Sequence, residues 1–439
     1  MPAAAARDAV RGLLLRLANL GAIRLFLLLL TLGIAVRTLM LLALDVPLEL
    51  QFAEMERIAR HLFRRGAFAD PYKVQTGPTA HHAPVYPFLI SLLFTAFGLT
   101  VAAGFAMAVM NFVFASLQWA LVPIISAKSN LPRVVGVAAA LLGATLPYRF
   151  MKEVRWEAAL VGAVLATLTL LTLHWWQRPQ PRAAHSFVLG LAWGTGMMCS
   201  PNLLPVFVVT VAIVVITSGR ERRRALIAHS AVVAVGVVIA VTPWTVRNYK
   251  ALGAFVFVRS NFGLEFSISN NPSAFVLAVD NLGKDDPTNY FHTHHPWSSR
   301  EEAQALLREG EVAYNRRKLH ETMAWIRNDP GQFGRLTAGR IAYFWFTPYT
   351  NQAWKNFVVT PLTMLAFYGL WSMLRQRLPL GYLLLAMWIS YPLVYYLVQT
   401  DTRYRYPIEW TFVLLAVFAL YTMIAPAKLM AIHENCRRS

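Results

Sequence analysis

The feature that most constrains this chain is a succession of long apolar runs that carry almost no charge. A helix needs about 20 mostly apolar residues to cross the hydrocarbon core of a bilayer, and such runs recur from end to end of the sequence. Over all 439 residues, 56% are hydrophobic and 14% are charged, whereas soluble domains carry about 25% charged residues. The sequence therefore predicts an all-α polytopic membrane protein. It excludes a disordered chain, and its two cysteines exclude a disulfide scaffold.

The apolar runs predict a bundle of about ten transmembrane helices, some of them short for a full span. The predicted helices cover residues 24–44, 101–125, 134–147, 157–173, 187–200, 203–217, 225–243, 358–374, 380–397 and 409–425. The chain then divides into an N-terminal segment, a transmembrane module with a first large loop inside it, a second large loop, a C-terminal transmembrane part and a tail. These segments are residues 1–23, 24–245 (first loop at 45–100), 246–357, 358–425 and 426–439.

Basic residues mark one side of the predicted bundle. Arginine and lysine gather in both terminal segments and in alternate short connections, from Lys128 and Arg133 to Arg375 and Arg377. Because such residues accumulate in cytoplasmic loops, both termini are expected in the cytoplasm and the two large loops on the opposite face. Topology accounts for part of the net charge of +19. The rest of the positive charge favours the lipid bilayer and an anionic lipid-linked substrate as partners. A nucleic acid is not expected as a partner.

Both large loops are expected to carry amphipathic helices. The hydrophobic spacing over residues 54–63 predicts a short helix, and Gly66 suits its end. The apolar stretch at 88–97 is too short to span and is expected to lie in the interface or to re-enter. In the second loop, the spacing of Ser298 and Glu301 is that of a capping box, which predicts one long helix running to Asp329-Pro330.

Three acidic residues stand at the boundary between the first predicted span and the first large loop, namely Glu49, Glu54 and Glu56. A carboxylate there could accept a proton from a sugar or lipid hydroxyl, or hold a divalent cation. Glu54 and Glu56 point in different directions on a helix, so at most one is expected to face a cleft. A solvated helix face, with ion pairs to Arg57 or Arg60, is the alternative.

Cations also occur on the predicted non-cytoplasmic side, where the positive-inside rule disfavours them. Arg149, Lys152 and Arg155 lie between the third and fourth predicted spans and are followed by Glu157. Such a group could bind phosphate, and Glu157 could balance its charge or serve as a second acid. An exposed turn without a ligand is the alternative.

Three more arginines lie close to or inside predicted spans. Arg403 and Arg405 stand among tyrosines before the last span, and this composition suits a phosphate whose lipid tail lies in the bilayer. Arg37 lies about two helical turns inside the first span, where a cation is expected to face a cavity or a partner. Snorkelling of the side chains to the headgroups is the alternative.

Histidines occur in both large loops. His81 and His82 lie in the first loop, and the second contains His292, His294 and His295. Neither spacing is a standard zinc motif, but a site shared by the loops could hold a divalent metal. His81 and His82 are therefore the candidate metal ligands, and the sequence implies no other cofactor.

Taken together, these stretches resemble the GT-C membrane glycosyltransferases. The segments EMERIARHLFRRGAFADPY and TGPTAHHAPVYPFLISLLFTAFG are similar to the first loop of bacterial relatives of protein O-mannosyltransferase and lipid A aminoarabinose transferase. The shared pattern is an acid, an A-x-x-L helix, G-x-F, and a P-x-YP segment that opens a leucine-rich helix ending in FG. It falls here on Glu54, Ala59, Leu62, Gly66, Phe68, Pro84, Tyr86, Pro87, Phe97 and Gly98. The stretches TPWTVRNYKALGAFVFVRSNFGLEFSISNNP and RYRYP match as well.

The resemblance implies a GT-C fold in a bacterial inner membrane and an inverting enzyme. Such an enzyme takes a sugar from a polyprenyl-phosphate donor and gives it to a glycan, lipid or protein acceptor on the non-cytoplasmic face. Glu54 would be the general base or the metal-holding acid, and Glu49 is the alternative for this role. Glu56 and Tyr86 would line the cleft of the first loop. Glu157 would be a further catalytic acid. Cations would stabilise the leaving phosphate. The candidates are Arg37, Arg149, Lys152, Arg155, Arg247, Arg403 and Arg405.

Two other functions fit parts of this pattern. A polyprenyl-lipid flippase or transporter would also need cations at the interface, but it predicts matched halves and charges deep in several spans. A glycan transferase resembling the O-antigen ligases would use a polyprenyl diphosphate oligosaccharide. A non-catalytic scaffold would leave the combination of an acid with several arginines unexplained.

Overall fold

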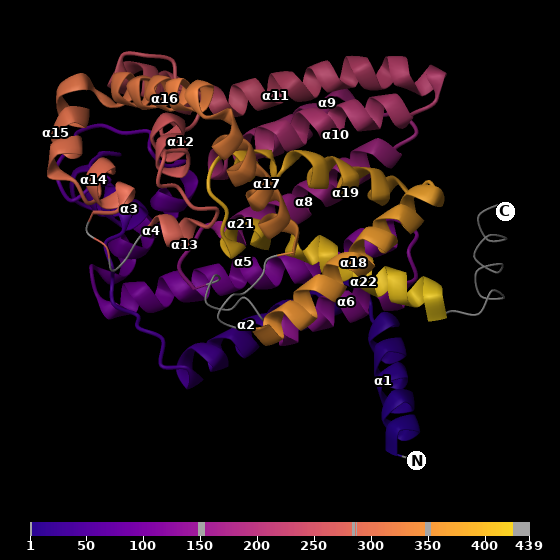
Figure 1. The fold of residues 1–439 in the computed structure, drawn as a ribbon. Helices are drawn as coiled ribbons and strands as arrows, with labels where there is room; N and C mark the ends of the chain where they lie inside the picture. Colours follow the sequence, from indigo (N-terminus) through magenta and orange to yellow (C-terminus); the bar gives the residue numbers. More distant parts are fainter. Residues whose placement is uncertain (1, 148–153, 283–285, 287, 347–352, 425–439) are drawn as a thin grey trace.

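The computed structural model describes residues 2–147, 154–282, 286, 288–346 and 353–424. Over these ranges the chain is helical, and pairing of extended segments is limited to two isolated bridges, Ala69 with Pro78 and Leu277 with Thr400. Figure 1 shows long helices lying side by side along most of the molecule. The prediction of an all-α fold is confirmed for the described part of the chain.

Helices cover every predicted span. Within the described residues, six helical segments are long and apolar enough to cross a membrane. They are Ala22–Ala43 (α2), Val101–Lys128 (α5), Ala158–Gln177 (α8), Arg220–Leu252 (α11), Pro379–Leu397 (α19, Pro379–Ser390, with α20, Leu393–Leu397) and Thr402–Ile424 (α21, Thr402–Arg405, with α22, Glu409–Ile424). The remaining predicted spans fall on α6 (Arg133–Thr145), α9 (Ala183–Cys199), α10 (Leu203–Thr217) and α18 (Ala353–Arg375). These helices make the chain a membrane protein, and the total of about ten spans stays a prediction.

The helix α11 is longer than the predicted span at 225–243. It begins among the arginines at Arg220 and continues through Pro243 to Leu252. It ends at Gly253, whose φ of 69° is favourable for a residue without a Cβ atom. The predicted division at residue 245 therefore falls inside a continuous helix, and Arg247 lies on that helix.

Small residues allow α9 and α11 to pack closely along this side of the bundle (Figure 1). A Cβ atom added at Gly190 of α9 would lie 2.1 Å from the Val233 carbonyl oxygen, and one at Gly236 would lie 2.5 Å from that of Phe187. Side chains at either glycine would push the helices apart, as in other close contacts between transmembrane helices.

The short helix predicted over residues 54–63 of the first large loop is confirmed. The helix α3 (Glu54–Arg65) buries Met55 and Ala59 and ends at Gly66, where φ is 64°. The apolar stretch that follows forms α4 (Val85–Phe97), which packs against α3. The two helices place Glu54 and the segment before α4 next to each other.

The second large loop contains several helices, and two of them occupy the stretch before Asp329-Pro330 where one long helix was predicted. The helices of the loop are α12 (Phe262–Ser269), α13 (Ala278–Asn281), α14 (Tyr290–His294), α15 (Arg300–Glu309), α16 (Glu311–Asn328) and α17 (Pro330–Phe346). Gly310 separates α15 from α16 because its φ of 81° lies outside the helical range. The cap also differs from the prediction: Ser299 accepts a hydrogen bond from the Glu302 amide at 3.3 Å, one residue beyond Ser298.

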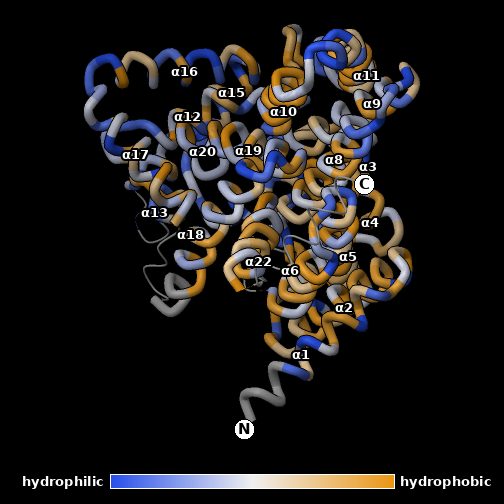
Figure 2. Tube along the Cα trace, turned by 90° about the vertical axis from the view of Figure 1, so that its right-hand side faces the viewer, coloured by the Kyte–Doolittle hydropathy of each residue, from blue (hydrophilic) through white to orange (hydrophobic). Residues whose placement is uncertain are grey.

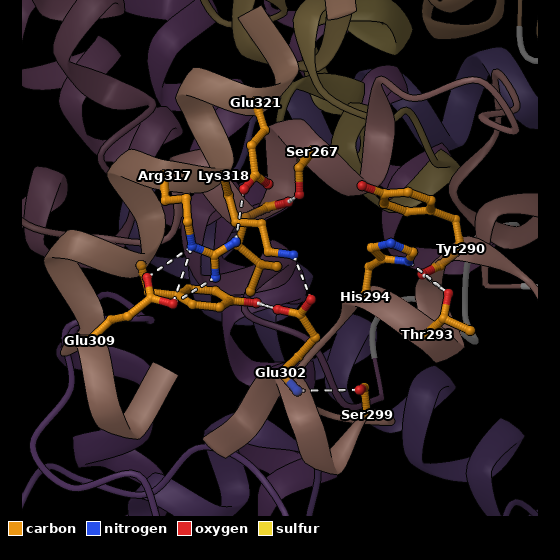
Figure 3. Close-up of polar contacts among 12 residues, drawn as sticks. Ser267, Tyr290, Thr293, His294, Ser299, Glu302, Glu309, Arg317, Lys318 and Glu321 are labelled. Atoms are coloured by element: carbon orange, nitrogen blue, oxygen red, sulfur yellow. Dashed lines mark hydrogen bonds and ion pairs between the residues drawn. The ribbon is translucent and has the colours of Figure 1, made fainter. Parts of the chain in front are cut away.

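A buried polar contact then fastens α15 to α16. Figure 3 shows the Glu302 carboxylate between two side chains of α16. Tyr314 donates its hydroxyl hydrogen to it at 2.6 Å, and Lys318 Nζ lies 2.9 Å away. Lys318 is buried, and Glu302 provides its ammonium group with an ion-pair partner. Hydrophilic residues are prominent along α16 and hydrophobic ones along α10 and α22 in Figure 2, as expected for a loop helix outside the bilayer.

Candidate functional site

Glu54 is the first residue of α3, and its carboxylate faces two imidazoles from the segment that leads into α4. Its Oε2 lies 3.0 Å from His82 Nε2 and 3.2 Å from His81 Nε2. One ligand atom from each of these three side chains lies within 4.8 Å of the other two. The structure thus brings the predicted acid together with both predicted metal ligands, and we call this set the Glu54 cluster.

Two contacts orient His81 within the cluster. The Tyr72 hydroxyl lies 3.0 Å from Nδ1 of His81, so that Nε2 is the ring nitrogen directed to Glu54. From the second large loop, Arg259 Nε donates to the His81 carbonyl oxygen at 3.0 Å. A histidine held on both its ring and its backbone can present one nitrogen in a fixed direction.

The backbone before the two histidines is also held from other elements. Glu311, at the start of α16, accepts hydrogen bonds from the Thr79 hydroxyl and from the Ala80 amide, the latter at 2.7 Å. Arg247 on α11 donates to the carbonyl oxygens of Phe68 and Thr79, each at 2.6 Å. The predicted phosphate ligand Arg247 therefore lies against the wall of the Glu54 cluster and ties α11 to the first loop.

Burial and mutual proximity shift the pKa values in the cluster. Burial disfavours the charged form of Glu54, but the neighbouring imidazoles of His81 and His82 hold its pKa well below the usual value. Burial lowers the pKa of His82 to about 4. For His81, burial acts to lower the pKa, and the Glu54 charge outweighs it, so the pKa is raised. Glu54 is therefore ionised and His82 neutral at neutral pH.

This set of donors fits a divalent cation. Two imidazole nitrogens and one carboxylate oxygen are the protein ligands of several catalytic zinc sites, which keep another position open. Metal-binding histidines have the second ring nitrogen hydrogen-bonded, as Tyr72 provides for His81. Imidazole binds a metal in its deprotonated form, and His82 is neutral.

The other acids of the first loop lie outside the cluster. Glu56 is buried; its carboxylate accepts from the Phe52 amide at 2.7 Å and lies 4.0 Å from Arg155 Nη1. The buried Tyr86 donates its hydroxyl hydrogen to the Arg155 carbonyl at 3.1 Å. Glu56 and Tyr86 therefore tie the first loop to the start of α8, and Glu49 is exposed.

Arg403 lies on α21, just before α22, and Glu157 directly precedes α8. The Arg403 guanidinium lies 4.3 Å from the centre of the Trp156 ring, and its Nη2 donates to the Tyr404 hydroxyl at 2.8 Å. Its Nε is buried without a hydrogen-bond partner among the described residues. Glu157 lies close enough to interact with it electrostatically. Arg403 thus retains hydrogen-bonding capacity for a ligand.

Two other predicted phosphate ligands are buried in the helix bundle. Arg37 is fully buried and donates at 3.1 Å to the carbonyl of Gly143, near the end of α6. Arg405 is 1% exposed, donates to the Thr363 hydroxyl at 2.8 Å and lies 3.2 Å from the Glu409 carboxylate. Both guanidinium groups satisfy buried protein groups, so neither enters the function proposed below.

The predicted phosphate ligands therefore occupy three kinds of position. Arg247 and Arg155 lie beside the first loop, Arg403 lies near Glu157, and Arg37 and Arg405 lie inside the bundle. The remaining two, Arg149 and Lys152, fall outside the described residues.

Two residues of the second loop that the sequence did not single out belong to the site. Arg259 bonds the His81 backbone, and its charge acts on both histidines. Glu265 on α12 lies within electrostatic range of His81 and of Tyr404, which neighbours Arg403. Their only signal in the sequence was their place in the stretch VRSNFGLEF, which carries no spacing that marks a site.

Comparison with known protein families and with curated proteins finds no match for this chain. Among solved structures, the chain is similar to the archaeal oligosaccharyltransferase AglB from Archaeoglobus fulgidus, in complex with an inhibitory peptide and a dolichol-phosphate. The sequence identity is 12%, the TM-score is 0.55, and the match covers 94% of this chain and 52% of that chain. The chain therefore shares its fold with that structure over most of its own residues, and it spans about half the length of that enzyme.

Proposed function

We propose that this protein is a membrane glycosyltransferase that transfers a sugar from a polyprenyl-phosphate donor to an acceptor on the face formed by the two large loops. The observation that supports the proposal is the Glu54 cluster, a carboxylate and two imidazoles spaced so that they could hold a metal ion, in a chain whose fold is similar to that of AglB. The dolichol-phosphate bound to AglB supports a lipid-linked donor. The acceptor would be a glycan, a lipid or a protein.

In this proposal Glu54, His81 and His82 hold a divalent cation. Such a cation, when bound, would stabilise the negative charge that develops on the donor phosphate. The lowered pKa of Glu54 makes it a weak proton acceptor. Holding the cation therefore suits Glu54 better than acting as the general base, the other role that its sequence suggests.

In this proposal Glu265 is the general base that accepts the proton of the acceptor hydroxyl. This residue is half-buried on α12, near His81, and Asn261 Nδ2 donates to its carboxylate at 3.3 Å. The acceptor hydroxyl would attack the anomeric carbon opposite the phosphate, and its proton would pass to Glu265. The bond from carbon to the phosphate oxygen would break at the same time, which inverts the anomeric centre and releases polyprenyl phosphate.

Cations on the walls of the site would receive the donor phosphate. Arg259 lies beside the two histidines, and Arg403 has a free Nε among the described residues. At the outer end of α11, a hollow of about 420 Å³ is lined by both apolar residues and the basic pair Arg247 and Lys250. This combination suits a polyprenyl phosphate that approaches from the bilayer, because the tail stays in an apolar environment while the phosphate meets cations.

A transfer assay tests the proposal. Purified full-length protein is incubated with a panel of polyprenyl-phosphate sugars, and the lipids are followed by mass spectrometry. One donor is expected to lose its sugar in wild-type protein, and Glu265→Gln is expected to lower kcat while donor binding stays unchanged. If every donor stays intact, or if the protein only moves intact donors across vesicle membranes, the proposal is wrong and a flippase is favoured.

A further inference from the structure

A second hollow lies at the opposite end of the bundle from the Glu54 cluster. Its volume is about 320 Å³, and it opens where α8 and α10 end and where α11 and α19 begin. In Figure 1 this is the end of α10 and α11 that is far from α3 and α15. Its lining includes Trp176, Ser218, Gly219, Arg222, Arg377 and Tyr382.

Arg222 is fixed in the wall of this hollow. Its Nη2 donates to the carbonyl oxygens of Trp176 and Arg178 at the end of α8, the second at 2.7 Å. Its Nε is buried and has no hydrogen-bond partner within the described part of the chain. Nη2 therefore holds the guanidinium in place, while the Nε donor is unused among the described residues.

The surroundings of Arg222 are positive and contain little compensating charge. Arg377 is exposed on the same hollow. Glu221 is the only acidic residue between Gln177 and Arg224, and it is exposed. The helix α11, which is 33 residues long, starts at this hollow after Gly219 without a side-chain cap. Its first amide groups therefore add positive potential to that of the two arginines.

The hollow is lined by aromatic residues of the kind found at the depth of lipid headgroups. The rings of Trp176 and Tyr382 stand edge to face with their centres 6.4 Å apart, and Trp176 Nε1 donates to the Ser218 hydroxyl at 3.1 Å. Tryptophan and tyrosine are enriched at the boundary between bilayer and water. The hollow lies at the ends of apolar helices, so an acyl chain could continue along them.

We propose that this hollow binds the phosphate of an anionic phospholipid from the leaflet on the basic side of the protein. Basic pockets between transmembrane helices on the cytoplasmic side recognise anionic headgroups, and arginine binds phosphate oxygens in a bidentate manner. The inference rests on the orientation that the basic connections predict and does not depend on glycosyl transfer.

The proposal is tested by native mass spectrometry of the full chain. The protein is released into the instrument from bilayers that contain both phosphatidylglycerol and phosphatidylcholine. The double variant Arg222→Gln/Arg377→Gln is compared with Arg220→Gln/Arg224→Gln, which changes the charge equally at two exposed positions of the same helix start. We expect wild-type protein to retain phosphatidylglycerol selectively. Each substitution in the hollow is expected to weaken that retention by about fivefold, while the control pair retains it as the wild type does.

Arg222 also caps α8, so the double variant could lose its fold. Arg377→Gln alone then carries the test, because the structure gives this side chain no hydrogen bond within the described residues. An equal loss in the control pair would show diffuse attraction, and equal retention of both lipids would show no selectivity. Displacement of the lipid by millimolar inorganic phosphate would show a site for free phosphate. Each of these three results would overturn the proposal.

Discussion

The charged residues near the Glu54 cluster and those inside the bundle look alike in sequence and differ in their surroundings. Arg37 and Arg405 are buried, and they bond to carbonyl oxygens, a hydroxyl and a carboxylate of the protein. Arg403 and Arg259 use part of their donors on the protein, Arg403 beside Trp156 and Arg259 beside His81. The first pair holds helices together, whereas the second pair remains able to bind a ligand.

A charged residue within an apolar run therefore marks a position where burial is unfavourable, but it does not reveal what the residue binds. A buried guanidinium must have partners, and helix ends supply carbonyl oxygens that lack partners in the helix. Arg37 meets that need at the end of α6. Whether an arginine binds substrate or a helix end is thus decided by elements far away in the sequence.

The largest effect is expected for Glu54→Gln, which keeps the size of the side chain and removes its charge. Transfer should fall by at least about 1,000-fold, equivalent to about 4 kcal/mol, because the cation loses its only carboxylate ligand in the cluster. Steady-state rates measure this loss. Glu49→Gln is the matched control because Glu49 is exposed, and it should leave the rate unchanged. A wild-type rate in Glu54→Gln would remove Glu54 from the site.

Arg405→Gln should affect folding and leave the chemistry intact. It removes the guanidinium that lies 3.2 Å from the buried Glu409 carboxylate, and breaking a buried ion pair costs about 3 kcal/mol or more of the free energy of unfolding. Thermal unfolding in detergent measures the loss, with rates expressed per folded molecule. A stable variant with a greatly raised KM for the donor would instead make Arg405 a substrate ligand.

Acidification should destabilise the metal-free protein through His82. Its pKa is lowered by burial to about 4 in the folded chain, from an ordinary value of 6.5. A lowered histidine pKa contributes stability that is fully present above pH 6.5 and is lost as the pH falls toward 4. Between pH 7.5 and pH 5 the loss should be about 2 kcal/mol. Thermal unfolding in a chelator measures it, and His82→Gln should show a smaller dependence over this interval. Identical curves for the two proteins would contradict the burial of a neutral His82.

The smallest effect is expected for Arg403→Gln. Losing one charge-assisted phosphate contact should raise the KM for the donor by about tenfold, or about 1.4 kcal/mol, with little change in kcat. Arg375→Gln is the matched control, because Arg375 also stacks on a tryptophan, Trp371, but lies on the basic side. Equal changes in the two variants would show that Arg403 only stacks on Trp156.

The sequence predicted those features that depend on local pattern. The spacing of apolar residues located α3, and Gly66 marked its end. Glu54 and the two histidines were named as separate candidates, and their meeting in one cluster was not predicted. The role of Glu265 was not predicted, because it depends on how the second large loop folds over the first. The break at Gly310 was also missed, since glycine at that position is compatible with both a helix and a turn.

In the proposed function, Glu54, His81 and His82 together bind one divalent cation. The most direct measurement is the metal content of the purified full chain after removal of bound metal by a chelator and reloading with zinc or manganese. We expect one tightly bound ion per wild-type chain and loss of that ion in both Glu54→Gln and His81→Gln, with Glu49→Gln retaining it. Equal metal content in all four proteins, or none in the wild type, would contradict the account.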